Sequence, residues 1–216
     1  MNNDNNTPQE QNGPKGQIAH KIVFLKGERI NLRLINAGDA ETFATWINDQ
    51  EISQYLSRGF PIDMKHEIAW IESMYKDNSS LTFAIETKDG ELIGNMGFNK
   101  IDHVSRTAVT GAMIGNKNFW GKGYGSEAKM LLLNYGFNTL NLRKINSDVV
   151  GFNERSINYS LKCGYVVEGR KKEQVYKNGK YYDLILLAAF KKDWMPVYEE
   201  YKKTGKFASA RHNDAT

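Results

Sequence analysis

Cysteine is almost absent from this chain of 216 residues, in which Cys163 is the only one. A lone cysteine forms no intramolecular disulfide and excludes a cysteine-based zinc site. Histidine is scarce too, and the four histidines, at positions 20, 66, 103 and 212, lack the spacing of metal ligands. We therefore expect no metal centre.

Long apolar runs are missing as well. No stretch approaches the roughly 18 consecutive apolar residues of a membrane-spanning helix. Residues 1–16 are polar and rich in Asn, Gln, Gly and Pro, without the apolar segment of a signal peptide. Together with the single cysteine, these features predict a cytoplasmic protein with no membrane partner.

Excess charge of one sign is small, since the formal net charge is +4. That surplus is too weak to indicate nucleic-acid binding, so we expect no nucleic-acid partner. It suits an anionic ligand, although an ordinary solvated surface explains it equally well.

The length and the hydrophobic content of 40% suit one domain with a sizeable core. We expect a disordered tail over residues 1–20, a single domain over 21–204 and a flexible tail over 205–216.

Hydrophobic periodicity predicts an α+β fold. The expected strands are 24–34, 81–87, 91–101, 107–114, 145–150, 165–176 and 180–190. The expected helices are 36–47, 64–76, 123–140, 154–163 and 193–203, with a short helical turn at 51–56. Asn178-Gly179 is the strongest hairpin signal. This order predicts a mixed central sheet with helices on both faces.

Residues 113–140 contain a glycine-rich turn between a strand and a helix. Gly121, Gly123 and Gly125 leave successive backbone N–H groups without side-chain cover, at the start of a helix. Such N–H groups bind phosphate oxygens, and Lys122 adds positive charge. A plain tight turn is the alternative. The spacing excludes a Walker A loop and a Gly-x-Gly-x-x-Gly dinucleotide fingerprint.

Two segments carry a family resemblance. Trp120-Gly121-Lys122-Gly123-Tyr124-Gly125 fills the pattern Gln/Arg-x-x-Gly-x-Gly/Ala, with Trp120 in place of Gln or Arg, and continues as Ser-Glu-Ala. The second segment is Asn153-Glu154-Arg155-Ser156, then seven further residues, then Gly164-Tyr165. Together they resemble the GNAT acetyltransferases, in the branch of ribosomal-protein and spermidine N-acetyltransferases. The resemblance covers roughly residues 24–194.

The resemblance implies the GNAT fold, mostly antiparallel, with acetyl-CoA as co-substrate and direct attack by an amine on the thioester. It places the pantetheine arm on the backbone of Met113, Ile114 and Gly115. It places the pyrophosphate on the loop that comprises Gly121, Lys122, Gly123, Tyr124, Gly125 and Ser126. Asn153 and Ser156 would contact the pantetheine, although Asn153 also suits a helix N-cap. A homodimer is left open.

Two positions depart from the family pattern. Relatives often protonate the CoA thiolate with a tyrosine seven residues after the Asn, where this chain has Ser160. Tyr159 lies one residue earlier, which turns a helical side chain by about 100°. We therefore expect Ser160, directly or through water, to be catalytic before Tyr159, whose alternative role is core packing. Val109 stands where relatives carry a glutamate, and it cannot act as a base.

The missing glutamate bears on the acceptor, because the attacking amine must be neutral. An α-amine with a pKa near 8 needs less help from a base than a lysine-like amine with a pKa near 10.4. We expect a protein N-terminus or another low-pKa amine, with a polyamine or an amino sugar as alternatives. A CoA-binding module without turnover and a ribosome-associated adaptor are rivals of other classes.

Weaker candidates concern the acceptor side. Glu173 and Asp183 fall on the last two predicted strands, where the family lines its acceptor pocket, although cross-strand pairing explains them too. Trp46, Tyr55 and Trp70 suit a roof over an acceptor, or the core.

Overall fold

The strands in the described part of the chain form one sheet of eight. The computed structural model describes residues 21–56, 59–74, 76 and 78–209; the expected tail over residues 1–20 lies outside them. Spatial order is β1-β2-β3-β4-β5-β6-β8-β7, and β5–β6 is the parallel pair. The strands are β1 (Val23–Lys26), β2 (Ile30–Leu34), β3 (Leu81–Thr87), β4 (Leu92–Asp102), β5 (Thr107–Ile114), β6 (Lys144–Val150), β7 (Val166–Lys177) and β8 (Lys180–Phe190). The mixed α+β class is confirmed.

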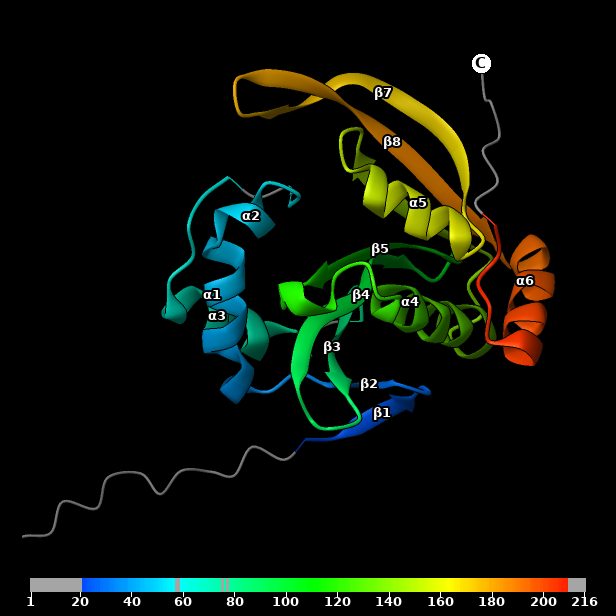
Figure 1. The fold of residues 1–216 in the computed structure, drawn as a ribbon, viewed down its shortest axis with the longest axis horizontal. Coiled ribbons are helices and arrows are strands. Elements are labelled where there is room, and N and C mark those ends of the chain that lie inside the picture. The colour runs from blue at the N-terminus through cyan, green and yellow to red at the C-terminus, as the bar shows by residue number, and fades with distance from the viewer. Residues whose placement is uncertain (1–20, 57–58, 75, 77, 210–216) are drawn as a thin grey trace, which may run out of the picture.

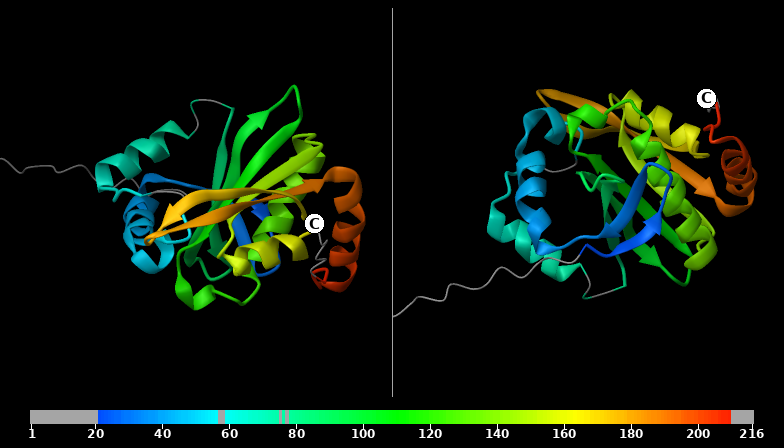
Figure 2. Two further views of the ribbon diagram at one scale, coloured as in Figure 1. Left: turned by 90° about the horizontal axis from the view of Figure 1, so that it is seen from above. Right: turned by 60° about the horizontal axis from the view of Figure 1, so that its bottom comes forward.

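The helices cover both faces of this sheet (Figure 1). They are α1 (Ala40–Asn48), α2 (Gln50–Ser53), α3 (Met64–Ser73), α4 (Tyr124–Asn134), α5 (Glu154–Lys162) and α6 (Lys191–Thr204). Figure 2 shows α1, α2 and α3 on one side of the molecule and α6 on the opposite side. None of the helices in the described residues is long and apolar enough to cross a membrane.

Local signals explain most of the element boundaries. Asp63 caps α3 by accepting a hydrogen bond from the backbone N–H of His66 at 2.9 Å. Asn178 and Gly179 have φ angles of 50° and 82°, as a two-residue hairpin turn of type I′ requires. Gly164, with φ 88°, ends α5.

Two expected elements differ in the structure. The first strand is a hairpin, β1 with β2, because Gly27 donates a hydrogen bond back to the carbonyl of Ile30. The expected helix over 123–140 is α-helical only to Asn134 and continues as a π-helix, Tyr135–Thr139. Gly136 lies in this segment, and a Cβ there would come within 2.6 Å of the Phe98 ring. Close packing on the sheet thus needs glycine at this turn.

Alternate residues of β3 face two cores, because successive strand side chains point to opposite faces. Phe83 and Ile85 belong to the larger core, together with residues of α4 and α6. Ala84 belongs to a smaller core that includes Phe43 of α1 and Ile71 of α3. The sheet therefore carries α1, α2 and α3 on one face as a separate packing unit.

A buried ion-pair cluster ties β2 to β3 and to the start of the helical unit. Arg33 is fully buried and contacts Glu86 and Asp39, each at 2.7 Å. Lys21, on the surface, forms a further ion pair with Glu86, with 2.6 Å between Nζ and Oε2. Both carboxylates therefore have a buried cationic partner.

Strands β5 and β6 separate in the middle of the sheet. They pair only over Thr107–Val109, whereas β5 stays paired with β4 as far as Ile114. Backbone groups of residues 110–114 on the β6 side therefore have no strand partner. This splay opens the site described below.

The β7–β8 hairpin arches over α5 toward α2 (Figure 1). Near its tip, Lys177 Nζ donates a hydrogen bond to the carbonyl of Ser53 at 3.3 Å. Beneath it, Phe152 packs on Tyr182, with ring centroids 4.7 Å apart, and on Tyr55 at 5.9 Å. The hairpin thus joins the two sides of the splay.

Candidate active site

A cavity of about 630 Å³ occupies the splay between β5 and β6. Its walls come from β5, the glycine loop, β6 and α5. Nine of the residues expected to bind or to react line it: Met113, Ile114, Gly121, Gly123, Gly125, Ser126, Asn153, Ser156 and Tyr159. Segments that are distant in sequence therefore meet in one space.

The glycine loop presents open N–H groups to this cavity. Gly121 and Gly123 have φ angles of 73° and 84°, which favour glycine. Gly123 is the N-cap of α4 and provides no side-chain cap, so the first N–H groups of the helix stay available. A cluster of such groups at a helix N-terminus is a binding site for phosphate.

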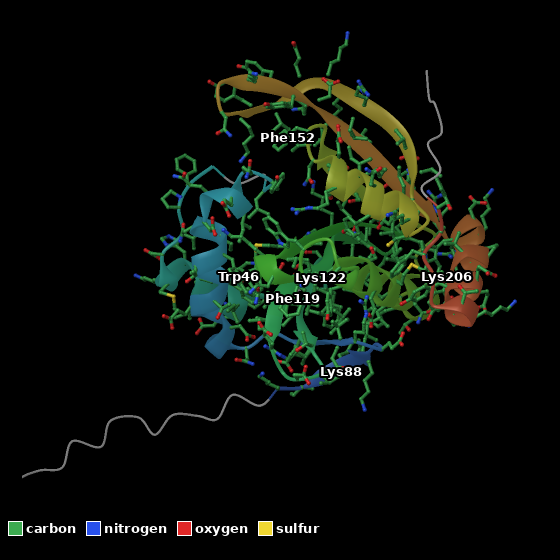
Figure 3. The ribbon with its side chains drawn as sticks, viewed as in Figure 1. Trp46, Lys88, Phe119, Lys122, Phe152 and Lys206 are labelled. Atoms are coloured by element: carbon green, nitrogen blue, oxygen red, sulfur yellow. The ribbon has the colours of Figure 1, made fainter. Side chains whose placement is uncertain are left out.

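Three expected contact residues, Gly115, Lys122 and Tyr124, are not among the described residues that line the cavity. At Gly115, a Cβ would overlap the Trp46 ring at 1.9 Å. The carbonyl of Lys122 accepts a hydrogen bond from Arg29 at 3.0 Å, and the Arg29 guanidinium lies 4.6 Å from the centroid of the Tyr124 ring. These contacts hold Gly115 against Trp46, and Lys122 and Tyr124 against Arg29; Figure 3 labels Lys122 and Trp46.

Trp120, which replaces the family's Gln or Arg, fixes the loop to the sheet. Its indole Nε1 donates a hydrogen bond to the carbonyl of Ile114 at 2.6 Å. That carbonyl is therefore already used, although Ile114 still lines the cavity. The Arg155 guanidinium lies 4.1 Å from the centroid of the Trp120 ring, a cation–π contact at the cavity wall.

The charges of this cavity favour an anion. Lys129, Arg155 and Lys162 line it, against Asp148 as the carboxylate among the described lining residues. A cationic wall next to the N-terminus of a helix attracts phosphate groups.

A second cavity of about 760 Å³ lies on the side of α1 and α3. Four residues line both cavities: Leu56, Gly111, Ala112 and Met113. The rest of its wall includes Glu67 and Trp70 of α3 and Asn95 and Asn99 of β4. Because Gly111 and Ala112 are small, the backbone of β5 is the partition between the two cavities.

A family model described as "Acetyltransferase (GNAT) domain" matches residues 29–166. The chain belongs to the GNAT acetyltransferase family. It is therefore an acyltransferase that acts as an N-acetyltransferase, and the GNAT family uses acetyl-CoA.

Similar proteins act on different amines, by their names. Spermidine N(1)-acetyltransferase of Escherichia coli is 33% identical over 182 residues, which cover 84% of this chain and 92% of that protein. The putative ribosomal N-acetyltransferase YdaF of Bacillus subtilis is 29% identical over 175 residues, covering 77% and 94%. A crystal structure of spermidine N-acetyltransferase from Vibrio cholerae, in complex with CoA and spermine, has a TM-score of 0.73 at 24% identity, covering 77% and 98%. This last likeness shows the fold.

In this acetyltransferase, the two expected catalytic residues lie in different surroundings. Tyr159 lines the cavity, and burial raises the pKa of its hydroxyl well above the ordinary value. Ser160 is fully buried and is not among the described lining residues. Its Oγ has no hydrogen-bond partner in the part of the chain that the structure describes. The position thus favours Tyr159 over Ser160.

Asn153 performs the capping role that was its alternative. Its side-chain oxygen accepts a hydrogen bond from the backbone N–H of Ser156 at 3.1 Å, at the start of α5. Both residues also line the cavity. The cap therefore holds a polar side chain at the wall of the site.

Glu173 and Asp183 pair across the hairpin. Asp183 accepts a hydrogen bond from the Glu173 backbone at 2.9 Å and lies 3.2 Å from Arg170. Neither residue is among the described residues that line the two cavities. A register shift interrupts the pairing of β7 with β8 between Lys171 and Val175.

The three aromatic residues expected to cover the acceptor, Trp46, Tyr55 and Trp70, lie in different places. Tyr55 lines the first cavity and Trp70 the second. Trp46 packs on Phe43, with ring centroids 5.9 Å apart. Among the described residues, no group of three His, Cys, Asp or Glu side chains could hold a metal ion.

Sequence reasoning missed Lys129 and Glu67. Lys129 is 1% exposed although it is a lysine, and Glu67 is 2% exposed. The available signal for Lys129 was its place in α4 within an otherwise apolar stretch. Glu67 gave no signal, because its helix looks like an ordinary amphipathic surface helix.

Proposed function

We propose that this acetyltransferase binds acetyl-CoA in the first cavity and receives a primary amine from the second. The observation that carries the proposal is the shared partition: Gly111, Ala112 and Met113 line both cavities. A thioester that lies along β5 on one side would meet an amine that approaches from the other. Attack is direct, because both reactants reach the same backbone stretch.

Each part of the first cavity then has a task. The open N–H groups from Gly121 to Ser126 hold the diphosphate. The unpaired backbone of residues 110–114 holds the pantetheine arm in the manner of an added strand. An amide N–H of the same stretch stabilises the oxyanion of the tetrahedral intermediate.

For the acceptor, we propose the α-amine of a protein or peptide N-terminus. The second cavity has one carboxylate, Glu67, among its described lining residues, together with the side-chain amides of Asn95 and Asn99. A single carboxylate matches one ammonium, and amides match the peptide groups that follow an N-terminus. A polyamine carries several ammonium groups, and further anions would be needed to pair them.

The amine's own pKa supports this choice. At pH 7 roughly a tenth of an α-amine is neutral, against roughly one in a few thousand for an amine with a pKa of 10.4. Val109 supplies no base, and its segment is still paired with β6. Glu67 is the carboxylate among the described residues that line the second cavity.

Spermidine is the second candidate acceptor. Glu67 favours it to the extent that it attracts a cationic amine, and a named spermidine acetyltransferase is a similar protein. A cytoplasmic location remains our prediction, supported by the buried free thiol of Cys163.

The test compares kcat/KM for an N-terminally free peptide and for spermidine between pH 6.5 and 9.5. We expect the peptide to be the better substrate at pH 7, with spermidine gaining as pH rises. Higher efficiency on spermidine at pH 7, with the peptide inert, would contradict the acceptor assignment. CoA binding without acetylation of any amine would identify a binding module.

A further inference from the structure

Lys129 is a buried cation in the wall of the first cavity. It extends from α4, is 1% exposed and lines the cavity. Its Nζ donates a hydrogen bond to Thr110 Oγ1 at 2.8 Å. No carboxylate among the described residues forms an ion pair with it.

The ammonium group of Lys129 retains hydrogen-bonding capacity. An ammonium has three N–H donors, and the described residues provide an acceptor for one of them. Aromatic rings flank it: Nζ lies 5.3 Å from the ring centroids of both Tyr159 and Tyr165. A buried ammonium in this state lacks the anion that would offset its desolvation.

Thr110 places this ammonium at the apex of the splay. Val109 is the last residue of β5 that pairs with β6, and Thr110 follows it. The Thr110 hydroxyl is held by Tyr165 at 3.0 Å and donates to the carbonyl of Asn146 at 3.2 Å. A ligand with its diphosphate on the glycine loop, extended along residues 114 to 110, brings its far end to this apex.

We propose that Lys129 is a catalytic residue that stabilises the departing sulfur of CoA as it becomes a thiolate. The inference rests on the proposed binding of acetyl-CoA in this cavity. The anion that Lys129 lacks in the protein alone is then formed by the reaction itself.

The step balances as follows. The neutral amine nitrogen forms a bond to the thioester carbonyl carbon, and the C–S bond then breaks with its electron pair on sulfur. The nitrogen releases its extra proton to water, and the thiolate pairs with the Lys129 ammonium. The sulfur takes a proton from water as CoA leaves, so Lys129 ends in its starting state.

The titration of Lys129 fits this role. Burial lowers its pKa to about 8, so at pH 7 roughly nine-tenths of it is charged. A charged donor forms a hydrogen bond roughly twice as strong as a neutral one. Tyr159, the other candidate in the wall, is a neutral donor whose pKa burial raises well above 10.

Cys163 and Tyr165, which lie near Lys129, titrate well above pH 8. Burial raises the pKa of Cys163 to about 12 and raises that of Tyr165 further. Thr110, on β5, does not titrate. The charged side chains that line the same cavity are Asp148, Arg155 and Lys162.

The first test is spectroscopic and needs no turnover. CoA is titrated in complex with the wild type by the ultraviolet absorbance of the thiolate. An adjacent cation lowers the pKa of an acidic group by roughly 1–3 units. We expect that shift for wild-type CoA complexes, its loss in Lys129→Met and its retention in Lys129→Arg. The exposed Lys203→Met is the matched control.

The second test is kinetic. Because the thioester sulfur is uncharged before reaction, Lys129→Met should leave KM for acetyl-CoA within about threefold and lower kcat roughly 10²–10³-fold. The wild-type kcat should fall as pH rises through about 8. This fall in kcat above pH 8 should be absent in Lys129→Arg, because a guanidinium stays charged. Tyr159→Phe should still show the fall in kcat above pH 8.

Several results would overturn the inference. An unshifted thiol pKa in the wild-type complex, or a kcat of Lys129→Met within twofold of wild type, contradicts it. Lys129→Gln serves as the second variant, and calorimetry checks that each variant is folded. A shifted thiol pKa without any amine turnover keeps the Lys129–sulfur contact and contradicts only the proposed function. Failure of the wild type to bind CoA contradicts both.

Discussion

Arg33 and Lys129 are both at most 1% exposed, yet their surroundings are opposite. Arg33 contacts two carboxylates, Asp39 and Glu86, at 2.7 Å. Lys129 has a hydroxyl and two aromatic rings around it, and no carboxylate partner among the described residues. One cation lies where the helical unit joins the sheet, the other in the wall of the cavity.

The difference distinguishes a structural ion pair, in what we call the frame of the molecule, from a charge in its candidate active site. Burial alone would lower both pKa values, but Asp39 and Glu86 outweigh it and the pKa of Arg33 is raised. Without such partners, the pKa of Lys129 falls to about 8. In the frame, charges offset one another within the protein; in the site, a charge is kept for something outside it.

The largest effect on stability is expected when Arg33, the paired cation, is replaced. Arg33→Met leaves Asp39 and Glu86 buried without their main partner, which typically costs about 3–5 kcal/mol of stability. For a domain of this size, that corresponds to a melting temperature lower by roughly 10 °C. Thermal unfolding followed by calorimetry measures it.

The exposed Arg143 provides the matched control, since its Nε donates to the carbonyl of Ser105 and no ion pair joins it to the described residues. Arg143→Met should shift the melting temperature by at most about 2 °C, as surface changes do. Equal shifts in the two variants would mean that the buried pairs contribute nothing beyond an exposed contact.

The unpaired cation should show the opposite behaviour. Lys129→Met removes a buried charge without stranding a carboxylate, so the variant should be more stable than wild type at pH 7. The difference is about 3 kcal/mol, because one pKa unit corresponds to about 1.4 kcal/mol and Lys129 moves from 10.5 to about 8.

The pH dependence gives the sign. Between pH 8 and 10.5 the unfolded chain holds the Lys129 proton and the folded chain does not, so wild-type stability gains as pH rises. The advantage of Lys129→Met should therefore shrink across this window in urea unfolding experiments. Parallel stability curves for the two proteins would contradict a lowered pKa at Lys129.

The sequence predicts the parts that local signals determine. The glycine loop, the Asp63 cap and the Asn178-Gly179 turn each depend on residues that are neighbours in the chain. The two cations do not: Glu86 lies 53 residues from Arg33, and Thr110 lies 19 from Lys129. Nothing in a single sequence says which group will face a buried cation across the fold.

The same reason explains why the sequence could not place every side chain of the site. Ser160 and Tyr159 are one helical step apart, and only the packing of α5 on its neighbours decides which one reaches the cavity. The second cavity takes residues from α3 and β4 without a motif. This cavity could therefore be recognised only from the folded structure.

Glycines allow the same comparison between site and frame. Gly125 lines the first cavity from within α4, and a Cβ there would touch Ile114 only at 3.6 Å, an ordinary contact. Gly125→Val should therefore fold, yet its branched side chain should cover the open N–H groups. We expect CoA affinity to fall more than about 100-fold, roughly 2.7 kcal/mol.

Isothermal calorimetry with CoA measures that loss, and Gly179→Val is the control with the same change outside the site. Unchanged affinity in a folded Gly125→Val protein would show that the diphosphate lies elsewhere.

The smallest expected effect concerns the glycine of the frame. At Gly179 a Cβ would meet nothing within 4 Å, so only the φ of 82° opposes substitution. Valine in this left-handed conformation costs about 1–2 kcal/mol, which lowers the melting temperature by a few degrees. Asparagine tolerates the conformation, so Gly179→Asn should melt close to wild type. Because the turn adjoins Lys177, which reaches Ser53 over the cavity, CoA affinity is measured alongside and should stay within twofold. A Gly179→Val protein as stable as wild type would mean that the hairpin tolerates another turn, and that its register is set by the strand pairing alone.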